Sequence, residues 1–372
     1  MKIVFSNNSS WSIYNFRRNL LSTLHNKGHE IIIIAPDGEY LEKLSNLGYR
    51  TSPLIIDNSS KSIYTNFKLF YDLYKKYKLI KPDIVLHNAI KPNIYGALVC
   101  RFLRIPVVNN ISGIGTLFIS NNLSSLLGKI LYRVSQKKVQ TIFFQNSNDL
   151  SFFTKNQLVK SIQCTLLPGS GVDLQRFKPK NVNREDKKIR FCFVGRLLGN
   201  KGIYEFIAAA KIIKSKYSKV EFFILGELYL QNPTAINQEE LNDWISQKIV
   251  TYLGKTDFVE DEIYKYDCIV LPSYREGMSR VLLEASSMAI PAITSDVPGC
   301  INVIEHGKNG FICKVRDSND LALQMEKFTN LSLEERYEMG KYGREKVEKE
   351  FDEKIVIEKY LNAIDQIEKH NI

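Results

Sequence analysis

The chain lacks any apolar run long enough to cross a membrane. Runs such as Ile31–Ala35 fall far short of the ~20 residues that a spanning helix needs. The opening segment MKIVFSNNSS turns polar after three apolar residues, so it is typical of a buried strand and not of a signal peptide. We therefore expect a cytoplasmic protein, either free or attached to the inner face of the membrane.

Paired cysteines are also missing. The six cysteines are scattered along the chain, and none belongs to a C-x-x-C pair. This spacing favours reduced thiols in the core over a disulfide framework or a zinc site.

Acidic residues are scarce in the first half of the chain. Residues 1–180 hold 24 Lys and Arg but 9 Asp and Glu, a net charge of 24 − 9 = +15, whereas the remainder holds 27 and 31, a net charge of −4. This asymmetry indicates an anionic partner such as membrane lipid, nucleic acid or an anionic substrate, with simple solubility as the alternative. The sequence has no recognisable recognition helix, zinc site or aromatic RNA-binding motif, which argues against nucleic acid.

What the sequence does contain is a regular alternation of short apolar and longer amphipathic segments. Such alternation predicts parallel strands joined by crossover helices, and 372 residues suit two domains of this α/β kind. The predicted strands are Lys2–Ser6, Glu30–Ala35, Arg50–Ile55, Asp83–His87, Val107–Asn110, Thr141–Phe144, Gln163–Leu167, Ile189–Val194, Val220–Leu225, Val250–Leu253, Asp267–Leu271, Ala292–Thr294 and Gly310–Cys313. The predicted helices include Ile13–Asn26, Tyr64–Leu79, Asn93–Leu103, Gly202–Lys214, Gln238–Ser246, Arg280–Met288, Asp317–Phe328 and Leu333–Glu348.

A polar, charged stretch with a proline, FKPKNVNREDKK, interrupts the alternation and is typical of a linker. We expect an N-terminal domain over 1–178, a linker over 179–188 and a C-terminal domain over 189–350. The last segment, 351–372, is expected to form an amphipathic helix that could return to the N-terminal domain. Ligands of two such sheets are expected at the carboxyl ends of the strands, in a cleft between the domains.

The first candidate binding segment is Gly195–Gly202, which follows the first strand of the second domain and opens a helix. A glycine lets the backbone approach a ligand, and a helix start presents free N–H groups to phosphate. Arg196 and Lys201 add full positive charges at the same place. The spacing differs from that of a Walker loop, and a chance match is the alternative.

The second candidate segment runs from Leu271 to Ala285 and also joins a strand to a helix. Glu276 lies in the loop, and Glu284 lies eight residues later in the helix. A carboxylate can accept hydrogen bonds from both hydroxyls of a sugar diol. The backbone N–H groups of Gly277, Met278 and Ser279 suit a diphosphate or sugar oxygens.

Taken together, these segments resemble glycosyltransferase family four, whose fold is GT-B: two Rossmann-like domains facing each other across a cleft. The E-x₇-E signature of that family is met by Glu276 and Glu284, and its basic pair by Arg196 and Lys201. The resemblance extends over nearly the whole chain. Further segments resemble the bacterial branch that builds O-antigen, capsule and lipid-linked glycans, namely Asn110–Phe118, Phe143–Asn146, Leu167–Asp173 and Pro291–Cys300.

The resemblance implies a retaining transferase that takes its sugar from a nucleotide sugar, most often a UDP-sugar. Arg196 and Lys201, beside Gly195, would hold the donor diphosphate, and Glu284 would bind the ribose. Glu276 would contact the transferred sugar, together with the backbone of 277–279. The family requires no metal or other cofactor, and the absence of a D-x-D motif agrees with that.

The same resemblance implies an acceptor carried on undecaprenyl diphosphate and bound by the N-terminal domain. In place of the family's Gly-Gly loop after the first strand, this chain has Ser9 and Ser10, and a single His87 stands where many members have two histidines. His87 could contact substrate or could be a structural strand-end histidine. The glycine-rich segment Ser112, Gly113 and Gly115 could cradle a diphosphate, with Lys91 as a candidate helper.

A lipid-linked acceptor would also explain the basic half, because such a surface would dock on an anionic membrane. The segment Leu123–Val134 could be a docking helix or an ordinary core-facing one. A nucleotide-sugar epimerase of the same architecture is the rival enzyme, and a non-catalytic binder of anionic polymers is the rival from another class.

Overall fold

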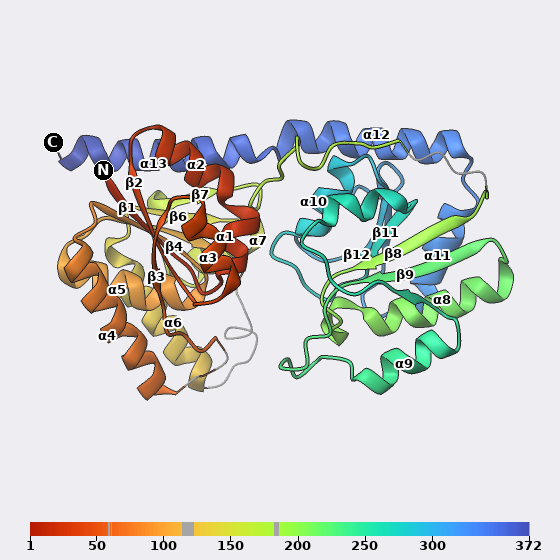
Figure 1. Cartoon of the computed structure of the whole chain (residues 1–372), viewed down its shortest axis with the longest axis horizontal. Coiled ribbons are helices and arrows are strands. Elements are labelled where there is room, and N and C mark those ends of the chain that lie inside the picture. The colour runs from red at the N-terminus through yellow and green to blue at the C-terminus, as the bar shows by residue number, and fades with distance from the viewer. Residues whose placement is uncertain (59, 61, 114–122, 182–185, 372) are drawn as a thin grey trace. The chain divides into compact units, whose positions relative to one another are not determined.

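The structure is a computed structural model that describes residues 1–58, 60, 62–113, 123–181 and 186–371. The chain divides into two compact units (Figure 1). Unit 1 consists of Met1–Ser170 with Lys354–Ile372, and unit 2 consists of Gly171–Glu353. The described part of the chain holds no helix that is both long enough and apolar enough to span a membrane.

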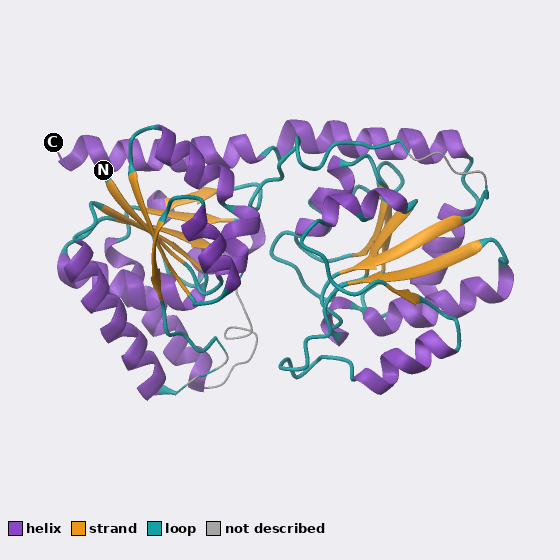
Figure 2. Cartoon of the chain, viewed as in Figure 1, coloured by secondary structure: helices purple, strands orange, loops and turns teal. Residues whose placement is uncertain are grey.

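Unit 1 is built on a parallel sheet with helices on both faces (Figure 2). The strand order is β3-β2-β1-β4-β5-β6-β7. The strands are β1 (Lys2–Ser6), β2 (Glu30–Ala35), β3 (Arg50–Pro53), β4 (Ile84–Asn88), β5 (Val107–Ile111), β6 (Thr141–Phe144) and β7 (Cys164–Leu166). The helices are α1 (Ser10–Phe16), α2 (Arg18–Asn26), α3 (Glu39–Asn46), α4 (Ile63–Ile80), α5 (Ala97–Leu103), α6 (Leu123–Ser135), α7 (Ser147–Lys155) and α13 (Glu353–Asn371).

Successive residues of the central strands of unit 1 enter two different cores. Ile3 and Phe5 of β1 pack with α1, α2, α3 and α13, whereas Val4 packs with α4, α5, α6 and α7. The continuous apolar run Ile31–Ile34 has the same cause, because β2 is covered on both faces. The helices of unit 1 therefore form two layers, one on each face of the sheet, and each layer has its own core.

Unit 2 repeats this architecture with the strand order β10-β9-β8-β11-β12-β13, again all parallel. The strands are β8 (Ile189–Val194), β9 (Val220–Leu225), β10 (Thr251–Tyr252), β11 (Cys268–Leu271), β12 (Ala292–Ser295) and β13 (Gly310–Cys313). The helices are α8 (Ile203–Lys216), α9 (Gln238–Ser246), α10 (Arg280–Ser287), α11 (Ser318–Thr329) and α12 (Leu333–Glu350). The predicted class, two Rossmann-like α/β domains, is thus confirmed.

The boundary between the units lies earlier than the expected residue 178. Val172 and Phe177 are buried in the core of unit 2. The N–H of Val172 donates to the carbonyl of Phe351 at 2.9 Å, and the N–H of Glu353 donates back to Val172 at 3.1 Å. The expected linker 179–188 consequently belongs to unit 2, and its residues 182–185 lie outside the described part of the chain. At the other end the break falls after Glu353 rather than at 350.

Two helices differ from their predicted form. The helix expected over Ile13–Asn26 is divided into α1 and α2 because the backbone of Arg17 leaves the helical region at φ −132°. The helix expected over Asn93–Leu103 begins with a π-helical turn, Pro92–Gly96, before α5. Proline is accepted there because the first turn of a helix needs no N–H from that residue.

Candidate functional site

Each sheet reverses its strand order at one point, and several of the predicted site residues follow the strands that flank it. In unit 2 the reversal lies between β8 and β11, and in unit 1 between β1 and β4. Open α/β sheets bind ligands at the carboxyl ends of the strands that flank such a reversal. The two predicted donor segments follow β8 and β11, and Ser9 and His87 lie at the carboxyl ends of β1 and β4.

The two donor segments of unit 2 touch each other directly. The N–H of Tyr274 donates to the carbonyl of Asn200 at 3.0 Å, and the hydroxyl of Ser273 donates to the same carbonyl at 3.3 Å. Gly202 has φ +79°, and a Cβ at that position would lie 2.1 Å from the carbonyl oxygen of Pro272. Only glycine therefore allows the loop before α8 to pack this closely on the loop after β11.

Lys201 and Glu276 form an ion pair across these two loops. The ammonium Nζ lies 2.5 Å from Oε1 of Glu276, and the two side chains are 22% and 12% exposed. Partial burial strengthens such a pair relative to one in bulk water. The arrangement holds one positive and one negative group side by side at the switch point of the sheet, which suits a ligand with both phosphate and hydroxyl groups.

The loop before α10 is held in place by a second close backbone contact. The N–H of Ser279 donates to the carbonyl of Gly299 at 3.0 Å. Gly299 has φ +80°, and a Cβ there would lie 2.6 Å from the carbonyl oxygen of Gly277. The Ser279 side chain makes no capping hydrogen bond to α10. The backbone N–H groups in the first turn of α10 therefore do not donate to the Ser279 hydroxyl.

Glu284 is buried in α10 and bonded to a neighbour on the same helix. Nε of Arg280 donates to Oε1 of Glu284 at 2.8 Å. Burial raises the pKa of Glu284, while the nearby charges of Arg280 and Arg176 oppose that rise. A buried carboxylate with a single guanidinium bond keeps capacity to accept hydroxyl hydrogen bonds.

Arg196 stands apart from the Lys201–Glu276 pair in its contacts. Its side chain is exposed, and its guanidinium carbon lies 5.3 Å from the centre of the Tyr229 ring. Gly195 packs closely against Gly226: a Cβ on Gly226 would lie 1.8 Å from the Gly195 carbonyl oxygen. The structure thus brings Lys201 and Glu276 into contact, whereas Arg196 and Glu284 each have other neighbours. That all four bind one ligand stays a prediction.

His87 is a buried histidine with partners on both ring nitrogens. Nε2 lies 2.9 Å from the hydroxyl of Tyr77, and Nδ1 lies 2.9 Å from Oδ1 of Asn109. The Asn109 amide donates to Gln136 and to the Asn93 carbonyl, so its oxygen accepts from His87 Nδ1–H. Burial lowers the pKa of His87 to about 4. These contacts match the structural alternative for this residue.

The other predicted acceptor residues have varied surroundings. Ser9 caps α1, because its hydroxyl accepts from the N–H of Ser12, and Ser10 is buried. Lys91 donates to two carbonyls and to Asn66 Oδ1, so it ties the segment before α4 to the rest of unit 1. Ser112 is exposed after β5 beside Gly113, and Gly115 lies outside the described residues.

Several residues that shape this region were not predicted. Arg280 could have been found from its spacing of four residues before Glu284, which places both on one helix face. Asn110 and Tyr360 are joined at 2.8 Å although they are 250 positions apart, and no local pattern reveals such a contact. Asn200 and Gly299 accept hydrogen bonds through their backbone carbonyls, which a pattern of charged side chains does not reveal.

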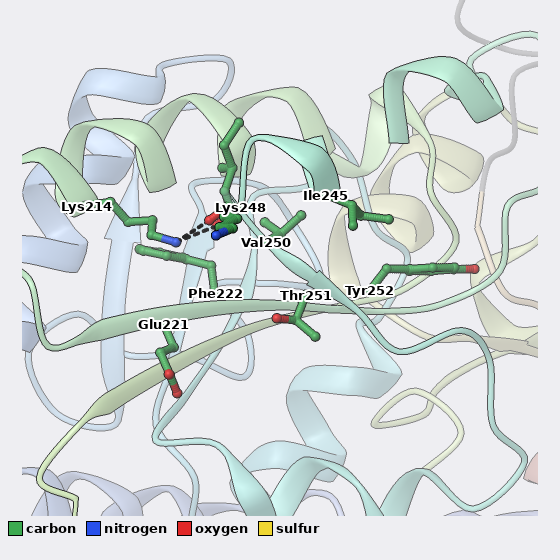
Figure 3. Close-up of a pocket in the computed structure, with 9 residues that line it drawn as sticks. Lys214, Glu221, Phe222, Ile245, Lys248, Val250, Thr251 and Tyr252 are labelled. Carbon is green, nitrogen blue, oxygen red and sulfur yellow. Dashed lines mark hydrogen bonds between the residues drawn. The ribbon is translucent and has the colours of Figure 1, made fainter. Parts of the chain in front are cut away.

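A surface pocket of about 440 Å³ lies elsewhere in unit 2, between α8, α9 and the edge strand β10 (Figure 3). Lys214 closes one side by donating to the carbonyl of Lys248 at 2.5 Å, and Glu221 and Thr251 also line it. None of the predicted site residues lines this pocket. Within the described ranges no group of three His, Cys, Asp or Glu side chains is placed to hold a metal ion, and a metal-free site stays a prediction.

Comparison with protein families gives two matches that together span most of the chain. Residues 175–346 match the glycosyl transferases group 1. Residues 2–146 match the family described as glycosyl transferase 4-like. The first match contains the whole predicted donor site, and the second contains all of the predicted acceptor residues.

Curated relatives extend the likeness over full length. A Campylobacter jejuni N,N'-diacetylbacillosaminyl-diphospho-undecaprenol alpha-1,3-N-acetylgalactosaminyltransferase is 28% identical, with 100% of both chains covered. The capsular polysaccharide biosynthesis glycosyltransferase CapM of Staphylococcus aureus is 26% identical over 92% of this chain and 91% of its own. A UDP-Gal:alpha-D-GlcNAc-diphosphoundecaprenol alpha-1,3-galactosyltransferase of Escherichia coli is 28% identical over 69% and 68%.

Solved structures share the fold at low identity. Sucrose-phosphate synthase from Thermosynechococcus elongatus superposes with a TM-score of 0.80 at 15% identity, covering 100% of both chains. Anabaena HepE, solved in complex with UDP, gives a TM-score of 0.79 at 15% identity and covers 98% of this chain and 100% of its own.

Proposed function

The chain belongs to the GT-B glycosyltransferases of family four, and we propose that it moves an N-acetylhexosamine or hexose from a UDP-sugar to an undecaprenyl-diphosphate-linked saccharide. Two of its curated relatives act on such lipid-linked acceptors, and one of them uses UDP-galactose. The product would be an intermediate of a bacterial surface polysaccharide such as O-antigen or capsule, as the name of the CapM relative suggests. Transfer would proceed with retention at the anomeric carbon.

The observation that carries the proposal is the Lys201–Glu276 pair between the loops that follow β8 and β11. A donor diphosphate beside Lys201 and Arg196 would have its growing charge stabilised as the nucleoside diphosphate leaves. Glu276 would accept hydrogen bonds from hydroxyls of the transferred sugar, and Glu284 from those of the ribose. The acceptor hydroxyl oxygen would then bond to the anomeric carbon on the face from which the diphosphate leaves, as the bond from that carbon to the phosphate oxygen breaks. The hydroxyl proton would pass to a phosphate oxygen of the leaving nucleoside diphosphate.

The acceptor would lie against unit 1, at the carboxyl ends of β1 and β4. Ser9, Ser10 and the backbone of Ser112 and Gly113 are the groups we assign to it. His87 contributes by its hydrogen bonds inside the fold, since both of its ring nitrogens have protein partners. The enzyme would work as a peripheral protein on the inner face of the plasma membrane, where such acceptors are anchored.

The test is a transfer assay with purified protein, a panel of UDP-, GDP- and dTDP-sugars, and a membrane extract that holds lipid-linked acceptors. We expect a free nucleoside diphosphate and a lengthened lipid-linked saccharide from a UDP-sugar. Activity should survive a chelator such as EDTA, because we assign the charge stabilisation to Lys201 and Arg196. An epimerised nucleotide sugar without a lengthened acceptor would contradict the proposal, and loss of activity on chelation would contradict its metal-free part.

A further inference from the structure

The two helix layers of unit 1 differ in charge. Helices α4, α5, α6 and α7 carry eight Lys and Arg and two Asp and Glu, whereas α1, α2, α3 and α13 carry five and six. These layers pack on opposite faces of the same sheet. The positive charge of the helices is therefore gathered on one side of unit 1, which the net charge of the sequence alone does not reveal.

Helix α4 has an exposed aromatic stripe on that side. Tyr64, Phe67 and Tyr71 are 66%, 65% and 50% exposed and follow a spacing of three and four residues, so they share one face of the helix. The opposite face, with Leu69 and Leu73, is buried in the core. Large exposed aromatic side chains in a row mark an interaction surface rather than ordinary solvent-facing residues.

Lysines are interleaved with these aromatic rings. Lys68 and Lys75 each lie with Nζ 4.5 Å from the ring centre of the tyrosine one turn earlier. Asp72, the single acidic residue of α4, pairs with Lys76 at 3.2 Å. The exposed stripe thus combines apolar rings with ammonium groups that no carboxylate of its own helix offsets.

Helix α6 adds a second exposed apolar stripe without an acidic residue. Leu126, Leu127, Ile130 and Val134 are each more than a third exposed, and all lie within one sector of the helix. Arg101 of α5 donates to the carbonyl of Val134 at 3.2 Å, which joins α6 to the helix that lies beside α4 in the same layer. The stripes of α4 and α6 consequently belong to one side of the unit.

The first turns of both helices lie at the edge of the sheet where ligands bind. Helix α4 leads back into β4, and α6 leads back into β6, so each starts at the carboxyl ends of the parallel strands. The exposed residues of these first turns, including Ile63 and Leu126, are therefore at the same end of unit 1 as Ser9. An amphiphilic ligand held at that end could leave its tail along this surface.

We propose that this side of unit 1 docks on an anionic lipid bilayer. We call it the docking face and define it by its exposed apolar residues Tyr64, Phe67, Tyr71, Leu126, Leu127 and Ile130. Aromatic and leucine side chains enter the headgroup boundary of a bilayer, while neighbouring lysines bind lipid phosphates. A second copy of the chain fits less well, because its docking face would bring like charges together. The inference rests on the proposed function, since a lipid-linked acceptor has its tail in the bilayer.

The charge contribution is tested by flotation of the full chain with vesicles of equal parts phosphatidylglycerol and phosphatidylcholine. The double variant Lys68→Gln/Lys75→Gln should bind about 25-fold more weakly, because each lysine near an anionic surface contributes about fivefold. The matched control is Lys211→Gln/Lys349→Gln, two exposed lysines of unit 2, which should bind like the unaltered chain. Binding of the unaltered chain should weaken at high salt.

The apolar contribution is tested with Tyr64→Ser/Phe67→Ser against the control Leu333→Ser/Tyr337→Ser, an equally exposed pair on α12. The docking-face variant should lose most vesicle binding and should lose transfer to membrane-bound acceptor in the same proportion. Transfer to a short water-soluble acceptor should stay unchanged in both variants. Circular dichroism and thermal unfolding check that all variants are folded.

Separate outcomes identify which proposal fails. Sugar transfer by a chain that does not bind vesicles, or equal loss in docking-face and control variants, would overturn the docking face and leave the transferase intact. Vesicle binding without transfer of any sugar would overturn the proposed acceptor chemistry instead. A shift from dimer to monomer in the docking-face variants, with no vesicle binding, would assign the surface to self-association and overturn the lipid proposal.

Discussion

At the scale of single residues, the donor loops hold their charges by different means. Lys201 reaches across to Glu276 on the neighbouring loop, whereas Glu284 is bonded to Arg280 within its own helix. Arg196 remains exposed over an aromatic ring. A bound diphosphate and its two sugars would compete for these groups, so the contribution of each can be measured by removing it.

Replacing Lys201 or Glu284 with alanine should weaken catalysis without unfolding the chain. Under the proposed donor assignment, each variant would lose a charged hydrogen bond to the nucleotide sugar, which contributes about 1.5–3 kcal/mol. That corresponds to a decrease of about ten- to 150-fold in kcat/KM. Steady-state kinetics with the preferred nucleotide sugar provide the measurement, and Lys211→Ala, an exposed site on α8, is the matched control. Unchanged kcat/KM in both variants would contradict the donor assignment.

His87 should make unit 1 sensitive to mild acid. Its folded pKa of about 4 lies below the value of 6.5 for an unstructured histidine, so the unfolded chain takes up a proton first as the pH falls. This group alone should lower the unfolding free energy by about 2 kcal/mol between about pH 7.5 and about pH 5. Urea unfolding of the unaltered chain, His87→Gln and the exposed-site control His25→Gln measures it. The pH slope should decrease in His87→Gln only, and an equal slope in all three would argue against the buried histidine.

At the scale of elements, most strands could be predicted because parallel strands covered on both faces leave unbroken apolar runs. The strand predicted over Ile189–Val194 has the observed bounds, and so has Glu30–Ala35. The break at Arg17 escaped prediction because the residues around it keep a helical pattern while one backbone angle departs from it. The domain boundary escaped for another reason: Val172 pairs with Asp352, and a pattern in a short window contains only one of them.

The candidate site was predictable in its charged residues and not in its geometry. The motifs located Lys201 and Glu276, and the family matches confirm that the chain is a glycosyltransferase. The contact between their loops depends on backbone groups of Asn200 and Tyr274, which carry no chemical signature in the sequence. Whether His87 was structural or functional could not be decided from its position at a strand end.

Replacing Gly202 should destabilise unit 2, because a Cβ at this position would clash with the loop that follows β11. Gly202→Ala meets both an unfavourable φ and the Pro272 carbonyl, whereas Gly307→Ala, at φ +77°, meets no neighbouring atom within 4 Å. The control should lose about 1 kcal/mol of unfolding free energy. The Gly202 variant should lose a further 1–3 kcal/mol, roughly, from overpacking. Chemical unfolding and UDP binding by calorimetry measure both effects. Equal losses in the two variants would show that the close approach of the loops is not required.

At the scale of the whole molecule, the two ends of the sequence share one core. Val356, Tyr360 and Ile364 of α13 are buried against the face of the sheet that also receives Ile3 and Phe5 of β1. The hydroxyl of Tyr360 accepts a hydrogen bond from the Asn110 amide at 2.8 Å. Unit 1 is thus made of two segments that are separated by all of unit 2.

Truncating a side chain near the end of the sequence should therefore weaken the first unit. Ile364→Ala should lower its unfolding free energy by about 2–4 kcal/mol, because a fully buried isoleucine leaves a cavity. Met325→Ala, equally buried in α11, is the matched change in unit 2. Hydrogen exchange should quicken in β1 and β4 for the first variant and in β8 and β11 for the second. Quickening of β8 with Ile364→Ala would contradict the division of the chain into these units.

The placement of α13 has a consequence for biosynthesis. Residues 1–170 leave the ribosome before unit 2, yet one face of their sheet keeps exposed apolar side chains until residues 354–367 have also been made. Unit 2 does not depend on a distant segment, since Gly171–Glu353 is continuous and contains all the residues of its own core. Of the two units, the one whose synthesis begins earlier is therefore completed later. While its apolar surface is uncovered, unit 1 presents the kind of surface that chaperones bind.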